Sequence, residues 1–265
     1  MKICIIGSSK RLKILEENLI KANYSVERIG SYSELKNNIS ADFAVLPIPT
    51  LNKDGYINLD GKSKLLPSEL LSKISPECKV VSCGFYHPDY KTEDLNLRDD
   101  FAYLNAVPTA EGAILYALQN TELALFESEI LITGFGRVAK ILADRLKAFS
   151  AKITIAARSA KDLSYATALG YKTIHLRELK ENAYRYNIIF QTIPSLIFGK
   201  EILDVMNEKN TIIELSSKST GTDSEYANSI GINVIHAPAL PERVLPQTAG
   251  NILTKCILSI ITEHK

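Results

Sequence analysis

The sequence has little net charge, few cysteines and no long hydrophobic run, and each shortage excludes a class of protein. Its 31 Lys and Arg residues nearly balance its 30 Asp and Glu residues, and no basic run stands out that could follow a nucleic-acid backbone or an anionic membrane. The apolar start at Lys2–Ile6 is too short for a signal sequence and for a membrane span of about 20 residues. We therefore expect a cytoplasmic protein that binds neither nucleic acid nor membranes.

Cysteine is scarce, and the four cysteines show no spacing that a metal or redox site would require. Cys4, Cys78, Cys83 and Cys256 lie in apolar stretches, without a CxxC pair and without a cluster of histidines nearby. Structural metal sites and redox pairs need such clusters, whereas buried thiols behave as small apolar side chains. We expect four buried free thiols, no disulfide and no metal.

The sequence is rich in short apolar runs that alternate with amphipathic stretches. At 265 residues, with 46% hydrophobic and 23% charged residues, the chain has the length and composition of two globular domains or one large domain. Such runs, followed by Gly, Pro or Ser and then by a helical pattern, predict the buried strands of parallel sheets and the α/β fold class. In the first part the runs are Lys2–Ile6, Ser25–Ile29, Phe43–Pro47 and Lys79–Ser82. In the second part they are Glu129–Thr133, Lys152–Ala156, Thr173–His175, Ile188–Thr192, Thr211–Leu215 and Asn233–His236.

The order of these patterns predicts two doubly wound, Rossmann-like domains with a cleft between them, linked by two long helices. One linking helix is expected from Ala113 to about Phe126, with Pro108 in the turn that starts it, and the other over Thr248–Thr262. The expected domains are residues 1–106 with 248–265, and residues 107–247.

Two segments of the first part show neither a helical nor a strand pattern. Asn52–Ser68 contains Gly55, Gly61 and Pro67 and has no sustained period, which predicts a long loop or a hairpin, before a short helix over Pro67–Lys73. Lys91–Asp100 mixes charges of both signs, which predicts a solvated surface.

The most informative motif is Gly134-Phe135-Gly136-Arg137-Val138-Ala139, which fits the pattern G-x-G-x-x-G/A. It follows an apolar run directly and begins an amphipathic stretch that leads to the next apolar run, so the whole strand, turn, helix and strand context is present. The first glycine permits a tight bend, the second lets the main chain approach a pyrophosphate, and the small last residue lets helix and sheet pack closely. The motif predicts a dinucleotide site, with a turn that binds no nucleotide as the alternative.

The end of the following apolar run indicates which dinucleotide is bound. A site for NAD carries Asp or Glu about 20 residues beyond the motif, whereas this sequence has Ala156-Ala157-Arg158-Ser159 there. Arg158 can pair with a 2′-phosphate, and Ser159 can donate to it. NADP(H) is therefore favoured, while an exposed arginine at a strand end, with NAD(H) also used, is the alternative.

Polar residues after the later apolar runs complete the expected site, because loops after the carboxyl ends of parallel strands face the ligand crevice. Thr192, Ile193, Pro194 and Ser216 are expected near the nicotinamide half of the cofactor. Turn formation is the alternative role for Pro194. His236 ends a run as well, and it is either an acid–base group near neutral pH or a structural histidine.

Seven segments of the chain share one family resemblance. They are Asn105–Ala113, Gly134–Ala139, Ala156–Ser159, Thr192–Ser195, Gly221–Asp223, Ala237–Pro241 and Thr248–Gly250. In this order they resemble the A subunits of dipicolinate synthase, and the likeness spans nearly the whole chain. Where bacillus-type members read Ser-Arg-Pro-Gly, this chain has Ser217-Lys218-Ser219-Thr220, which keeps a cation but loses the Pro-Gly pair.

The resemblance implies a cytoplasmic enzyme in the mother cell of a sporulating bacterium, acting with a flavoprotein-like B subunit. The implied reaction forms dipicolinate, pyridine-2,6-dicarboxylate, from hydroxy-tetrahydrodipicolinate of the lysine pathway or from its dehydrated form, by hydride transfer to a nicotinamide cofactor. Aromatisation removes a hydride and a proton, so the site also needs a base and cations for two carboxylates. Whether the chain forms a homo-oligomer stays open.

These requirements assign roles to the remaining residues. Lys218 or Arg137 could hold one carboxylate, and the N–H groups of a helix that starts after Pro108 could bind the other. The substrate contacts expected there are Pro108, Thr109, Ala110 and Gly112. Glu111 is the only carboxylate in that turn, so it is either the catalytic base or a residue that stabilises the helix start.

Two other classes of protein would keep the same architecture. The first is an ordinary two-domain 2-hydroxyacid dehydrogenase or an adenosylhomocysteinase-like enzyme. The sequence shows no clear set of Arg, Glu and His in the order that such a dehydrogenase requires. The second is a non-catalytic scaffold protein that binds the nucleotide while a partner performs the chemistry.

Overall fold

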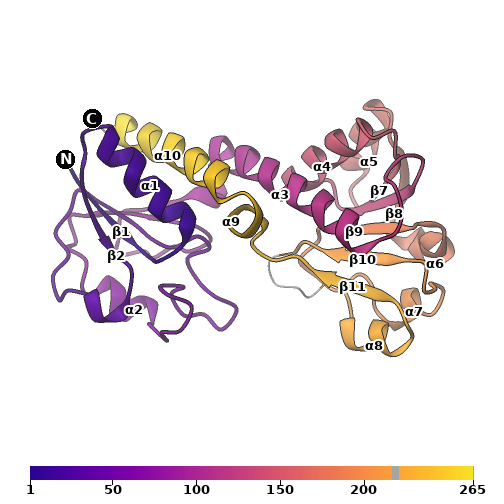
Figure 1. The fold of residues 1–265 in the computed structure, drawn as a ribbon, viewed down its shortest axis with the longest axis horizontal. Coiled ribbons are helices and arrows are strands. Elements are labelled where there is room, and N and C mark those ends of the chain that lie inside the picture. Colours follow the sequence, from indigo (N-terminus) through magenta and orange to yellow (C-terminus); the bar gives the residue numbers. More distant parts are fainter. Residues whose placement is uncertain (217–220, 265) are drawn as a thin grey trace. The chain divides into compact units, whose positions relative to one another are not determined.

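The structure, a computed structural model, describes residues 1–216 and 221–264. The chain forms two compact units, one made of Met1–Asn105 with Leu245–Lys265 and the other of Ala106–Val244. Each unit is built on a sheet of parallel strands with helices packed on it (Figure 1). The α/β class and the two Rossmann-like folds expected from the sequence are confirmed.

The first unit contains, within the described residues, a five-stranded sheet in the order β2-β1-β3-β4-β5. Helices α1 and α10 cover one face, where Leu12, Leu15 and Leu253 are buried against strand residues such as Ile5. The C-terminal helix therefore completes the core of the N-terminal sheet. The elements of this unit are β1 (Lys2–Ile6), α1 (Lys10–Lys21), β2 (Ser25–Ile29), β3 (Phe43–Val45), α2 (Pro67–Leu71), β4 (Lys79–Ser82), β5 (Thr92–Asp94), the first residues of α3 (Asp99–Asn120), and α10 (Pro246–Glu263).

The other face of this sheet is covered by a loop-rich segment. Ile57 pairs with Leu51 and Leu65 through isolated antiparallel bridges, and Ile57, Leu65 and Leu70 are buried against the strands. The loop expected over Asn52–Ser68 is confirmed up to Leu66, after which α2 begins, and its apolar side chains cover this face together with those of α2.

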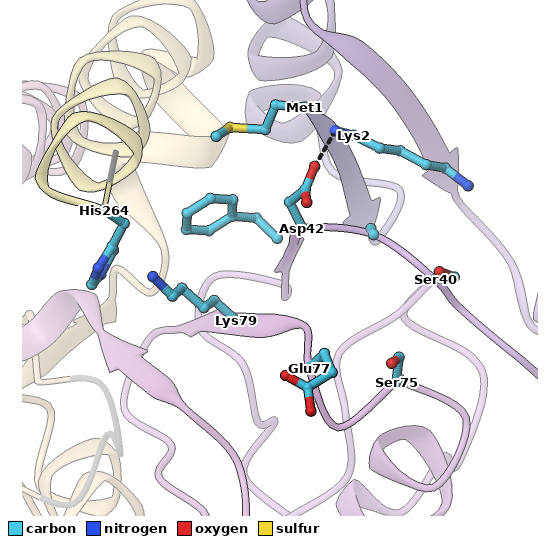
Figure 2. A pocket seen from close by; sticks show the side chains of 10 residues that line it. Met1, Lys2, Ser40, Asp42, Ser75, Glu77, Lys79 and His264 are labelled. Atoms are coloured by element: carbon cyan, nitrogen blue, oxygen red, sulfur yellow. Dashed lines mark hydrogen bonds between the residues drawn. The ribbon is translucent and has the colours of Figure 1, made fainter.

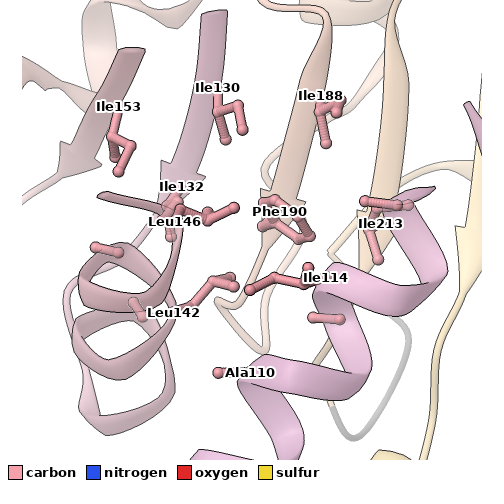
Figure 3. Packing of buried hydrophobic residues seen from close by; sticks show 14 of the residues in the cluster. Ala110, Ile114, Ile130, Ile132, Leu142, Leu146, Ile153, Ile188, Phe190 and Ile213 are labelled. Carbon is pink, nitrogen blue, oxygen red and sulfur yellow. The ribbon is translucent and has the colours of Figure 1, made fainter. Parts of the chain in front are cut away.

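The second unit contains, among the residues described, a six-stranded sheet in the order β11-β10-β9-β6-β7-β8. Figure 3 shows how Ile132, Phe190 and Ile213 of three neighbouring strands pack with Ile114 of α3 and Leu142 of α4. Each strand matches an apolar run of the sequence. The elements are β6 (Glu129–Thr133), α4 (Arg137–Lys147), β7 (Lys152–Ala157), α5 (Ala160–Ala168), β8 (Lys172–His175), α6 (Leu179–Asn182), β9 (Ile188–Gln191), α7 (Lys200–Leu203), β10 (Thr211–Glu214), α8 (Ser224–Ser229), β11 (Asn233–His236) and α9 (Leu240–Val244).

Helix α3 begins earlier than the sequence predicts. It spans Asp99–Asn120 and encloses Pro108, so the expected helix start at Pro108 is wrong. The main-chain N–H groups of Thr109–Gly112 lie in the helix interior, where the helix's own hydrogen bonds use them, and not at a positive helix end. Small side chains at helical spacing, such as Ala110 and Ala117, are fully buried in the core. This packing outweighs the cost of an interior proline, which is about 3 kcal/mol.

Strand β5 is also absent from the sequence-based prediction. Thr92, Glu93 and Asp94 pair in parallel with β4 at the edge of the first sheet. All three are only partly buried, so the charged side chains reach water while the main chain completes the sheet. The solvated surface expected for Lys91–Asp100 thus includes a strand that no apolar pattern marks.

Candidate functional site

The turn between β6 and α4 has the geometry of a dinucleotide-binding turn. Gly134 adopts φ of +82°, and its N–H donates to the carbonyl oxygen of Ala156 on β7 at 2.8 Å. A side chain at this position would place its Cβ atom 3.0 Å from Oγ1 of Thr192. Only glycine fits this bend, because other residues disfavour the left-handed region and the neighbouring loop leaves no room.

The space in front of helix α4 is open. Gly136 is the N-cap of α4, no side chain caps this end, and the first turn carries no acidic residue. A Cβ atom at Gly136 would meet no heavy atom within 4 Å. Ala139 is 1% exposed and packs against the sheet. These features fit a pyrophosphate, because the helix N-terminus offers N–H donors and partial positive charge, and the missing side chain leaves room.

The phenylalanine between the two glycines anchors the turn. Its ring centroid lies 6.0 Å from that of Tyr165 and 6.2 Å from that of Tyr171, both in edge contacts. The ammonium group of Lys140 lies 5.6 Å from the Phe135 ring centroid. The Phe135 side chain is therefore buried among side chains of the protein itself. Arg137, in the first turn of α4, is partly buried, as is Val138.

A pocket of about 220 Å³ lies between this turn and the end of β7. Five of the residues singled out in the sequence, from three separate loops, line it together: Gly134, Phe135, Arg158, Ser159 and Ile193. Asp162 and Ser195 line the pocket beside these residues.

The side of this pocket next to the end of β7 presents one cation and one acid. Arg158 is exposed, and its guanidinium forms no ion pair within the described ranges. The Ser159 hydroxyl caps α5 by accepting from the main-chain N–H of Asp162 at 3.4 Å. Asp162 was not predicted as a site residue, although its place three residues after an N-cap serine is a recognisable helix-start signal. Its carboxylate could accept from ribose hydroxyls, as the acid of an NAD site does.

A buried glutamine holds the loop that follows β9. Gln191 is 0% exposed; its Nε2 donates to the carbonyl oxygen of Ile193 at 3.0 Å, and its Oε1 accepts from the Ile193 N–H at 2.8 Å. The hydroxyl of Thr192 donates to the Thr133 carbonyl oxygen at 2.6 Å. Thr192 and Ile193 are thus fixed beside the glycine turn, whereas Pro194 is exposed.

A buried carboxylate follows at the end of β10. Glu214 is 1% exposed, and its Oε1 accepts from the Ser216 hydroxyl at 2.5 Å and from the Ser216 N–H at 3.2 Å. Its Oε2 accepts from the Thr222 hydroxyl at 3.0 Å. The Ser216 side chain is therefore directed into the protein. Lys218, the expected carboxylate-binding cation, lies outside the described residues.

The two other residues proposed for catalysis lie on different elements of the second unit. His236 ends the edge strand β11, is exposed, and has its Nε2 3.1 Å from the hydroxyl of Ser224. Glu111 lies in α3, where its carboxylate is 3.6 Å from Nε of Arg145, and both side chains are nearly half exposed. Next to it, a Cβ atom at Gly112 would lie 3.0 Å from Cβ of Leu240, so Gly112 faces the protein core.

A larger hollow, of about 470 Å³, lies in the first unit at the amino ends of β1, β3 and β4 (Figure 2). The main-chain N–H of Lys2 donates there to Oδ2 of Asp42 at 2.6 Å, and Lys79 lies 5.7 Å from the Phe43 ring centroid. Ligands of open parallel sheets bind at the carboxyl ends of the strands. We therefore place the functional site in the second unit's pocket and not in this hollow.

The four cysteines are buried and free, as expected. Burial raises the pKa of Cys4, Cys83 and Cys256 to about 12 and that of Cys78 to about 11, so they stay protonated near neutral pH. Among the described residues, no cluster of three or more His, Cys, Asp or Glu side chains is arranged to hold a metal ion. In the same residues, no helix combines the length and the apolar character needed to cross a membrane.

Known proteins similar to this chain include dipicolinate synthases. No protein-family model matches the chain. The A subunit of dipicolinate synthase from Bacillus subtilis (strain 168) is 28% identical, in an alignment that covers 99% of this chain and 96% of that protein. The resemblance to this kind of protein is confirmed. The crystal structure of the corresponding protein from Bacillus halodurans superposes with a TM-score of 0.84 at 27% identity, covering 98% of this chain and 97% of that one.

The fold is shared more widely than the sequence. Salmonella D-lactate dehydrogenase has a TM-score of 0.66 at 13% identity, over 100% of this chain and 97% of that one. The likeness to the two dipicolinate synthase proteins is stronger in both measures and includes both units of the chain.

Proposed function

We propose that this chain is the oxidoreductase subunit of a dipicolinate synthase and forms pyridine-2,6-dicarboxylate by hydride transfer to a nicotinamide cofactor. One observation carries the proposal: the turn Gly134–Gly136 leaves the N-terminus of α4 uncapped and open. The likeness to the Bacillus subtilis dipicolinate synthase protein over 99% of the chain supports this assignment among the many enzymes that share such a turn.

The second unit supplies the groups that would hold the dinucleotide. The N–H groups that follow Gly136 face the open space in which a pyrophosphate fits. Arg158 and Ser159 line the pocket beside this turn, and Ile193 forms another part of its wall. When bound, a nicotinamide cofactor supplies the hydride acceptor.

We propose NADP(H) as the preferred cofactor, with NAD(H) also accepted. Arg158 forms no ion pair in the described part of the chain, so its guanidinium can pair with a 2′-phosphate. Asp162 lines the same pocket, and its carboxylate would repel that phosphate but accept from an unmodified ribose. The balance of these two charges supports dual use.

The substrate would be the dehydrated form of hydroxy-tetrahydrodipicolinate, from which loss of a hydride and a proton leaves the aromatic ring. Glu111 and His236 are the proposed bases, and both are exposed enough to exchange protons with water. Lys218 is proposed on sequence grounds to pair with a carboxylate. A second carboxylate site at the N–H groups of Thr109–Gly112 is not retained, because they lie inside α3.

The relatives are named as A subunits, which implies that their enzymes contain a second polypeptide. We propose that a flavoprotein-like B subunit works with this chain in the cytoplasm of a sporulating cell. The substrate chemistry then belongs to the lysine pathway, which provides the cyclic dicarboxylate.

The deciding experiment measures cofactor binding and product formation separately. The purified chain should bind NADPH and NADH in a titration, and with its flavoprotein-like partner it should convert the lysine-pathway precursor into a product with pyridine absorbance. If neither NADPH nor NADH binds, the proposal is refuted. Binding of a cofactor, combined with turnover that Glu111→Gln, His236→Asn and Lys218→Ala all leave unchanged, would favour the scaffold alternative.

A further inference from the structure

Three buried polar residues form a row across the carboxyl end of the second sheet. Thr133, Gln191 and Glu214 are the last residues of β6, β9 and β10 and are register partners in the parallel ladders. Register partners point to the same face of a parallel sheet. They are 0%, 0% and 1% exposed. The residues two positions earlier on the same strands are apolar and buried in one cluster: Leu131, Ile189 and Ile212.

Both polar atoms of the amide of Gln191, the central residue of this row, form hydrogen bonds. Nε2 of Gln191 donates to the carbonyl oxygens of Ile193 at 3.0 Å and Ser195 at 3.5 Å. Its Oε1 accepts from the Ile193 N–H at 2.8 Å and from the Thr133 hydroxyl at 2.5 Å. Ile193 and Ser195 line the pocket next to the glycine turn. One buried side chain therefore fixes two residues of the pocket wall.

Further along the chain, the main chain at Gly221 packs against the same Gln191 amide. A Cβ atom there would lie 1.9 Å from Nε2 of Gln191. The Gly221 carbonyl oxygen accepts from the N–H groups of Ile197 at 2.9 Å and Phe198 at 3.0 Å. Gly221 thus closes over the amide and holds the far end of the loop that begins at Thr192.

We infer that Gln191 is a positioning residue for the cofactor: its amide holds Ile193 and Ser195 in the positions at which they line the pocket. The inference rests on the proposed function, because it takes the pocket to be a dinucleotide site. The role needs a donor and an acceptor on one side chain at once. Leucine would supply neither, and a carboxylate would supply only acceptors.

Gln191→Glu tests this role because its effect depends on pH. The ionised carboxylate would face the Ile193 carbonyl oxygen and repel it, whereas the protonated acid can donate to that oxygen as the amide does. Burial, and the neighbouring acid Glu214 on β10, should raise the pKa of the introduced carboxyl above its usual range. Among described residues, segments 192–198 and 221–222, which pack on the amide, carry no ionisable side chain.

The measured quantity is the dissociation constant of NADPH for the variant divided by that for the parent chain. We expect a ratio near one at pH about 5.5 and a ratio of about ten or more at pH about 8.5. Gln119→Glu makes the same chemical change at an exposed position of α3, and its ratio should stay near one at both pH values. The binding ratio needs neither substrate nor a partner protein.

Gly221→Ala provides an uncharged second variant. Its methyl group would push the Gln191 amide from its partners, so NADPH binding should weaken about tenfold at every pH. The inference is overturned if the parent binds NADPH while both variants, folded by circular dichroism, bind it equally well across the pH range. If the parent chain itself binds neither NADPH nor NADH, the proposed function fails instead.

Discussion

Gly136→Val, in the glycine turn, separates cofactor binding from folding. The dihedral angles of Gly136, φ −77° and ψ −170°, are accessible to valine. Its Cβ atom would meet no protein atom within 4 Å. The added side chain would therefore fill only the space that a pyrophosphate needs.

The two effects of this change differ in size. Loss of a favourable N-cap glycine costs about 1 kcal/mol, which lowers Tm by roughly 2–4 °C in a chain of this size. Exclusion of the pyrophosphate should weaken NADPH binding at least about a hundredfold, or about 2.7 kcal/mol. The chain contains no tryptophan, so binding is best followed by calorimetry or by the fluorescence of NADPH itself.

The second unit offers a matched control in Gly199→Val. Gly199 is the N-cap of α7, with φ −86° and ψ 178°, and a Cβ atom there would make only an ordinary contact of 3.8 Å with Leu196. It should show the same small fall in Tm and unchanged NADPH affinity. The reasoning is refuted if Gly136→Val binds NADPH within about threefold of the parent chain while its Tm matches that of the control.

The remaining predictions concern three charged groups. Arg158→Asp should weaken NADPH binding by at least about tenfold more than NADH binding. Equal losses of affinity for the two cofactors in paired titrations would show that Arg158 does not bind the 2′-phosphate. Glu111→Gln should lower turnover by about 10²–10⁴, while the loss of the exposed ion pair with Arg145 should lower the free energy of unfolding by under about 1 kcal/mol. Unchanged turnover in the presence of the flavoprotein-like partner would show that Glu111 serves only in that surface ion pair. Pairing with Arg98 lowers the pKa of Glu263 from 4.5 to about 2. The ion pair therefore stabilises the folded state fully above pH 4.5, and this stabilisation is lost as the pH falls toward 2. The Tm difference between the parent and Arg98→Met should therefore shrink over that window, and a constant difference from pH about 6 to 2 would contradict this account.

Features encoded by neighbouring residues could be predicted from the sequence. The central strands β6, β7, β9 and β10 coincide with apolar runs because they are buried on both faces. The glycine turn is recognisable because its whole context lies within about 30 residues. Pro108 misled the prediction for the opposite reason. Its local preference is a helix start, but α3 is held by contacts of Ala110 and Ala117 with strands distant in the sequence.

The polar row at the strand ends could not be found from spacing along the chain. Thr133 and Gln191 are far apart in sequence, and only the register of β6 and β9 brings them together. A signal does exist. Four strands of the second unit each end on an apolar residue followed by a polar one, and in β6, β9 and β10 this polar residue closes a strand that is otherwise largely buried. The pairs are Ile132-Thr133, Phe190-Gln191, Ile213-Glu214 and Ile235-His236.

The same row links the two halves of the proposed cofactor site. Thr133 precedes Gly134 in the dinucleotide turn, and its carbonyl oxygen accepts from the Thr192 hydroxyl at 2.6 Å. The Thr133 hydroxyl donates to Oε1 of Gln191 at 2.5 Å. A Cβ atom at Gly134 would come within 3.0 Å of Oγ1 of Thr192. A side chain in the pyrophosphate turn would thus displace the loop on β9, whereas one at Gly136 would not, so the two glycines of the motif serve different parts of the site.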